Sequence, residues 1–84
     1  MPTAFVLINS ELSYDAEIIQ KIKEILGDNT DLKYQIQGVY GIYDIVLKVS
    51  SDDGPKLRKM ITNEIRKIAK VKSTLTMMVI EEQE

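Results

Sequence analysis

Six short segments with a clear hydrophobic period limit most strongly how this chain of 84 residues can fold. Four of them are runs rich in β-branched and aromatic side chains, which is typical of strands. The other two repeat apolar residues at every third or fourth position, which predicts amphipathic helices. The predicted strands are residues 3–9, 32–39, 42–50 and 71–80, and the predicted helices are residues 14–26 and 55–69.

Residues at the helix ends support these boundaries. Ser13 precedes the first helix and is predicted to cap it, and Gly27 follows its last residue. Pro55 stands at the start of the second helix, where its missing N–H would have no helical partner in any case.

The order strand, helix, strand, strand, helix, strand is that of a split βαβ arrangement. Right-handed crossovers place both helices on one face of a four-stranded antiparallel sheet. The sequence therefore predicts an α+β, ferredoxin-like βαββαβ fold, formed by a single domain over residues 1–84.

Such a fold leaves the second face of the sheet uncovered. Val46, Met78, Ile80 and one apolar side of the first strand are predicted to lie there. Each large apolar side chain that stays in water forgoes about 1.5–3 kcal/mol of burial free energy. A homodimer that packs sheet against sheet is the simplest remedy, and a monomer with a partly apolar sheet surface is the alternative.

The composition excludes several functions. Cysteine and histidine are both absent, which removes disulfides, thiolate metal sites and the commonest general base. No basic leader and no apolar run of about 20 residues is present, so we expect a cytoplasmic protein that does not enter membranes. We also expect no cofactor and no enzymatic activity. The abundance of Ile, Lys and Glu indicates a thermophilic source.

The stretch GVYGIYDIVLKV, residues 38–49, carries the most distinctive chemistry. Gly41 tolerates positive φ and is predicted to reverse the chain in a tight turn between two strands. Tyr40, Tyr43 and Asp44 place two phenols and a carboxylate around exposed backbone amides. Such a rim can bind a small polar ligand.

Four signatures extend over nearly the whole chain, namely AFVLIN at residues 4–9, VYGIYDIVLKV at 39–49, ITNEIRKI at 61–68 and VKSTLTMMVI at 71–80. On these residues the sequence resembles the ligand-binding (RAM) domain of the Lrp/AsnC family of transcription regulators. It is similar to the stand-alone form of that module, without the DNA-binding helix-turn-helix domain.

The resemblance implies homodimers that assemble into rings, often tetramers of dimers, with an amino-acid effector held at the dimer–dimer interface. It also implies mixed assembly with full-length regulators of the family. A carboxylate such as Asp44 can bind an α-ammonium group, while N–H groups and hydroxyls bind an α-carboxylate. The ligand-binding residues implied by position are Tyr40, Gly41, Ile42, Tyr43, Asp44, Ser73, Thr74 and Thr76.

Structural roles compete with this interpretation. Gly41 can serve the turn alone, and Asp44 can cap the turn or pair with Lys48. Tyr40 and Tyr43 can be packing residues. Two other classes also stay open: an ACT-like regulatory subunit, which shares the element order, and a small dimeric αβ-barrel enzyme, which the absence of His and Trp disfavours.

Basic residues concentrate in the second half of the chain. Seven of the eleven lie between Lys56 and Lys72, where Glu64 is the one acid, so phosphate contacts are conceivable. Cations near a helix C-terminus also interact favourably with the helix dipole, and the sequence shows no pair of aromatic residues for stacking on bases. We therefore expect a solvated basic face and no direct binding to nucleic acid.

Overall fold

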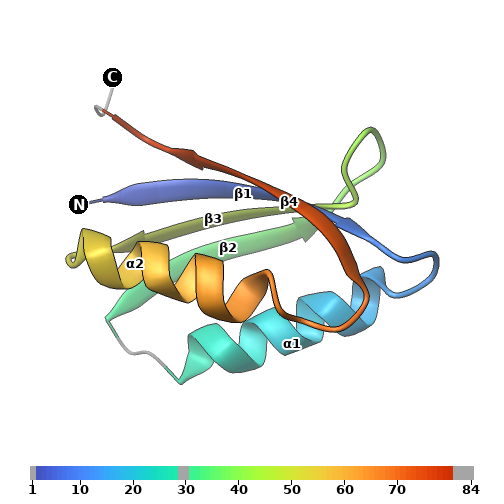
Figure 1. Cartoon of the computed structure of the whole chain (residues 1–84), viewed down its shortest axis with the longest axis horizontal. Helices are drawn as coiled ribbons and strands as arrows, with labels where there is room; N and C mark the ends of the chain where they lie inside the picture. The colour runs from blue at the N-terminus through green and yellow to red at the C-terminus, as the bar shows by residue number, and fades with distance from the viewer. Residues whose placement is uncertain (1, 29–30, 81–84) are drawn as a thin grey trace.

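The computed structural model describes residues 2–28 and 31–80, which form a four-stranded antiparallel sheet with the helices against one of its faces (Figure 1). The predicted α+β, ferredoxin-like fold is confirmed. In chain order the elements are β1 (Thr3–Ser10), α1 (Asp15–Gly27), β2 (Leu32–Gly38), β3 (Ile45–Ser51), α2 (Gly54–Met60), the π-helical turn η1 (Ile61–Ile65) and β4 (Val71–Met78).

β1 lies inside the sheet, whose strand order is β2-β3-β1-β4. Alternate residues of β1, beginning with Ala4, are completely buried, and so are their partners on β3. The apolar sides of α1 and of α2–η1 pack on this face, as the helical period predicts. The core consists mainly of Ala4, Val6, Ile8, Ile18, Ile22, Leu26, Ile45, Leu47, Val49, Leu57, Ile61 and Ile65.

The helix ends differ in part from the prediction. Ser13 does not cap α1, because its φ of 71° places it in a left-handed turn in which the Tyr14 N–H donates to the Glu11 carbonyl at 3.1 Å. At α2 the cap is Asp53, whose carboxylate accepts a hydrogen bond from the Lys56 N–H at 3.1 Å. Pro55 lies in the first turn of α2, as predicted.

The second helix is shorter and less regular than the predicted range 55–69. Beyond Met60 the chain widens into η1, where the Arg66 N–H donates to the Ile61 carbonyl at 3.3 Å. The wider turn still leaves both Ile61 and Ile65 buried, so the apolar stripe continues through it.

The connection between β2 and β3 is longer than the tight turn predicted at Gly41. β3 begins only at Ile45, and the Val39 N–H donates to the Asp44 carbonyl at 2.8 Å, which closes a loop over the residues between them. This hairpin tip, residues 39–44, projects from the sheet at the same end as the loop that follows β1 (Figure 1).

The uncovered face of the sheet carries a different set of side chains from the predicted one. Met78 pairs with the buried Ala4 and therefore faces the helices, and Ile80 lies beyond the end of β4. Leu75 and Met77 take their place, with 44% and 45% of their surface exposed. We call this surface the open face; its apolar residues are Phe5, Leu7, Val46, Leu75 and Met77.

The cap of α2 gives a first test of this local structure. Asp53→Ala removes the acceptor of the Lys56 N–H, so we expect the free energy of unfolding to fall by about 1 kcal/mol. Asp52→Ala is the matched control, because the neighbouring exposed carboxylate does not cap the helix, and it should change stability by less than about 0.5 kcal/mol. Urea denaturation measures both, and equal losses in the two variants would contradict the cap.

Candidate functional site

A cavity of about 720 Å³ opens where three segments meet at one end of the sheet. Its walls come from residues 10–13, residues 38–41, Asp15, Asp44 and Lys72. Its volume lies within the usual range for sites that bind small molecules. We call it the hairpin cavity, because the hairpin tip forms one side of it.

Asp44 fixes the hairpin tip to the end of β1. Its Oδ2 atom accepts hydrogen bonds from the Ser10 backbone N–H at 2.9 Å and from the Ser10 hydroxyl at 3.4 Å. Its own backbone N–H donates to the Ile8 carbonyl at 3.0 Å. Asp44 thus has a structural role, and the alternative pairing with Lys48 does not form, since the Lys48 ammonium lies 5.8 Å from the centre of the Phe5 ring.

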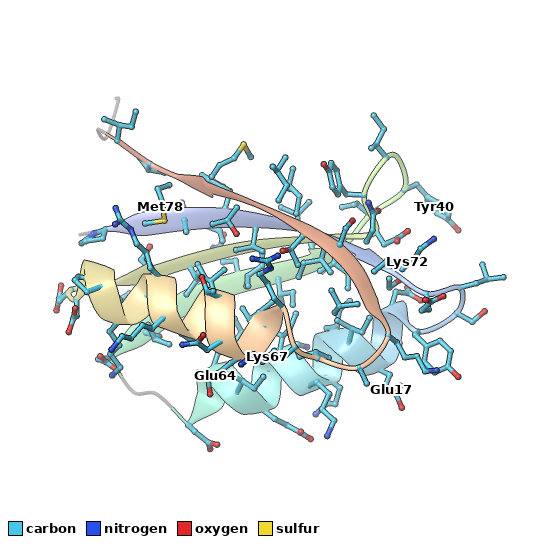
Figure 2. The ribbon with its side chains drawn as sticks, viewed as in Figure 1. Glu17, Tyr40, Glu64, Lys67, Lys72 and Met78 are labelled. Atoms are coloured by element: carbon cyan, nitrogen blue, oxygen red, sulfur yellow. The ribbon has the colours of Figure 1, made fainter. Side chains whose placement is uncertain are left out.

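The loop after β1 is tied to the segment before β4 in a similar way. The Glu11 N–H donates to the Lys70 carbonyl at 2.8 Å, and the Lys70 ammonium lies 4.9 Å from the centre of the Tyr14 ring. These contacts hold Lys72, at the start of β4, in the wall of the cavity, at the end of the molecule where Figure 2 also shows Tyr40.

The charges of the hairpin cavity are mixed. Glu11, Asp15 and Asp44 contribute carboxylates to its wall, and Lys72 contributes an ammonium group. Within residues 2–28 and 31–80, no group of three or more His, Cys, Asp or Glu side chains is arranged to hold a metal ion. A ligand that carries both an ammonium and a carboxylate group would find a partner of opposite charge for each.

The hairpin tip has an exposed apolar rim. Tyr40, labelled in Figure 2, and Ile42 are almost fully exposed, and so is Leu12 in the loop after β1. Gly41, between the first two, has a φ of +146°, and a Cβ atom placed on it would meet nothing within 4 Å. A glycine is therefore required at position 41 because of the backbone angle and not because of a close neighbour.

The structure brings together only some of the predicted site residues. Tyr40, Gly41 and Asp44 line the hairpin cavity, whereas Ile42 and Tyr43 belong to the same loop without lining it. Ser73 lies at the edge of the open face, where its hydroxyl accepts a hydrogen bond from the Asn9 amide at 3.3 Å.

Thr74 and Thr76 lie away from the hairpin cavity. They pair with the buried residues Ile8 and Val6 and line a separate groove beside α2 and η1. Of the polar residues that line the hairpin cavity, sequence reasoning missed Ser10, Glu11, Ser13, Asp15 and Lys72. The polar stretch that follows the predicted first strand was a signal for the first two, because β1 ends next to the start of β3.

The part of the chain that the structure describes contains no helix long and apolar enough to cross a membrane. This finding concerns its helices alone.

The anchoring role of Asp44 can be tested by stability. Asp44→Ala leaves the half-buried Ser10 N–H without its acceptor and should lower the free energy of unfolding by about 1–3 kcal/mol. Asp44→Asn keeps an oxygen acceptor and should lose less. Glu11→Ala, which removes another carboxylate of the same cavity, should stay within about 0.5 kcal/mol of the unchanged protein in the same denaturation experiment. Equal losses for Asp44→Ala and Glu11→Ala would contradict the anchor.

The chain is similar to several solved structures. It matches the crystal structure of FFRP-DM1 with 32% identity and a TM-score of 0.78, covering 95% of this chain and 100% of that one. The Escherichia coli AsnC structure gives 21% identity and a TM-score of 0.75, covering 96% of this chain and 52% of AsnC. A complex of the transcriptional regulator NMB0573 from Neisseria meningitidis with L-Met gives 11% identity and a TM-score of 0.72, covering 99% of this chain and 52% of NMB0573.

Scans against protein-family models and against curated proteins found no match. The likeness to AsnC and NMB0573 shows a shared fold, whereas the likeness to FFRP-DM1 extends to the sequence over nearly all of both chains. Together with the four sequence signatures, these similarities show that the chain belongs to the Lrp/AsnC family of regulators, in which it corresponds to the ligand-binding RAM domain.

Proposed function

We propose that this chain is an amino-acid-binding regulatory module, and that it acts by changing its assembly with itself or with full-length Lrp/AsnC regulators. The observation that carries the proposal is the hairpin cavity, which sets carboxylates against an ammonium group beside an exposed apolar rim. In this proposal the single domain, residues 1–84, both binds the effector and oligomerises, and it performs no catalysis.

The charges of the cavity suit a free amino acid. The Oδ1 atom of Asp44 has no hydrogen bond within the described residues, so it can accept one from an α-ammonium group. Lys72 and the exposed backbone N–H groups of the hairpin tip can bind the α-carboxylate. The L-Met complex of NMB0573, a regulator with the same fold, supports this class of ligand.

Neighbouring copies would complete the site. The rim residues Leu12, Tyr40 and Ile42 are 91%, 107% and 87% exposed, which is unusual for three large side chains so close to one cavity. We propose that this rim is the contact between dimers and that a second dimer closes the hairpin cavity. An effector held there would favour the assembled state, because a ligand stabilises the species that binds it.

The dimer itself is proposed to form through the open face. The five apolar side chains of this face lie together across β1, β3 and β4, and two such sheets can pack about 10 Å apart with their side chains interdigitated. Leu75 and Met77 lie on the edge strand β4, so covering them also protects an exposed sheet edge from other partners.

Two variants separate the two contacts. Leu75→Glu places a charge within the proposed dimer contact and should give monomers. Ile42→Glu introduces the same charge at the rim and should stop assembly at the dimer. Sedimentation velocity at micromolar concentration measures both. A compact monomer formed by the unchanged protein would contradict the proposed dimer, and full-size assemblies of Ile42→Glu would contradict the proposed rim contact.

Thermal unfolding with each of the twenty amino acids tests the ligand. An effector at 100 times its dissociation constant should add about 2.7 kcal/mol to the stability of the folded state. Lys72→Met should abolish most of this gain, whereas Lys67→Met, which removes a lysine outside the cavity, should preserve it (Figure 2). If no amino acid at millimolar concentration stabilises the protein against thermal unfolding, the proposed sensor function is wrong, whereas the assignment of the fold is unaffected.

A further inference from the structure

A second cavity, of about 380 Å³, lies between the helical segment formed by α2 and η1 and the edge strand β4. Arg58, Thr62 and Arg66 line it from α2, η1 and the residue after η1, and Thr74 and Thr76 line it from β4. We call it the helix–strand groove. The two cavities share no lining residue, and Lys72 of the hairpin cavity and Met78 of this groove lie toward opposite ends of β4 (Figure 2).

The π-helical turn aligns the two arginines. Arg58, Thr62 and Arg66 are spaced four residues apart, and in a regular α-helix each such step drifts by about 40° around the axis. The i to i−5 hydrogen bond from Arg66 to Ile61 widens the turn and reduces this drift. Both guanidinium groups thus border the same groove, and π turns of this kind are frequent at functional sites.

These arginines have no acidic partner within residues 2–28 and 31–80. Lys56 on the same helix provides a contrast, because it donates a hydrogen bond to Asp31 at 2.8 Å and so holds the pKa of that carboxyl below its usual value. Glu64, within η1, lines a different hollow together with Lys59. The positive charge of Arg58 and Arg66 is therefore not balanced by any carboxylate among the described residues.

The opposite wall of the groove supplies hydroxyl groups. Thr74 and Thr76 occupy the helix-facing side of β4, where their strand partners Ile8 and Val6 are fully buried. The rest of the lining is apolar and comes from Ile61, Leu75 and Met78. The groove thus combines two guanidinium groups, several hydroxyls and an apolar floor within one small cavity.

We propose that the helix–strand groove binds a small organic phosphate ester. Two guanidinium groups balance the charge of a phosphate dianion, and each can donate paired N–H bonds to its oxygens. The threonine hydroxyls donate to the remaining oxygens, and the apolar floor contacts the organic part of the ester. No aromatic side chain lines the groove, so it lacks the stacking surface typical of sites for single-stranded nucleic acid. This inference does not depend on the proposed amino-acid site.

The assignment is tested by titrating the unmodified protein with glycerol 3-phosphate and recording backbone amide NMR shifts. Saturable shifts should concentrate in η1 and β4 and leave the hairpin tip unchanged. Arg66→Gln should weaken binding roughly tenfold, since a hydrogen-bonded charge is lost. Lys67→Gln removes the same charge from the next residue, which does not line the groove, and should weaken binding less than about twofold.

Other outcomes would overturn the proposal. Equal weakening by Arg66→Gln and Lys67→Gln would show attraction to the basic surface in general. Shifts confined to the hairpin tip, or none at millimolar ester, would also reject it. Tighter saturable binding of a short DNA duplex than of the ester would assign the arginines to a nucleic acid. The amide spectrum of Arg66→Gln verifies that the variant is folded, so a loss of affinity cannot be mistaken for unfolding.

Discussion

The helices cover only one face of the sheet, and the rest of the molecule follows from this constraint. β1 lies between β3 and β4, so its two faces meet opposite environments. Ala4, Val6 and Ile8 are buried by the helices, while Phe5 and Leu7 belong to a face that no described segment of the chain covers. A chain of this size gains much of its stability from burying apolar surface, so a half-covered sheet favours association with a further copy.

The periods of the sequence were sufficient to predict the fold but not which side of β4 faces the helices. In β3 one side is wholly apolar and the other is mixed, whereas β4 carries large apolar residues at Leu75, Met77 and Met78, on both of its faces. The pairing of β4 with β1, whose register shifts at Asn9 and Ser10, determines which side of β4 faces the helices. A shift of one residue exchanges the two faces of a strand, so periodicity alone cannot assign them.

The candidate site was predictable where it is local and unpredictable where it is assembled from distant segments. Asp44 could be selected as a polar residue beside a turn, but its partner Ser10 lies 34 residues away and became visible only through the pairing of β1 with β3. Ser73, Thr74 and Thr76, which the family resemblance implied as ligand-binding residues, show the same limit, because they lie on two different faces of β4. Successive residues of a strand point to opposite faces, and a short polar stretch does not indicate which face borders a cavity.

The net charge of −2 lacks the basic excess typical of a dedicated nucleic-acid-binding domain, yet that sum conceals how the charges are distributed. Three carboxylates gather at the hairpin cavity, and two arginines without acidic partners in the described residues border the helix–strand groove. The two cavities adjoin along β4, because Lys72 of the hairpin cavity is two residues, or about 7 Å, from Thr74 of the groove. Their charges nevertheless differ, since carboxylates outnumber the single ammonium group in the first and two guanidinium groups border the second. Each can therefore select its ligand by its own groups, whatever the overall charge of the chain.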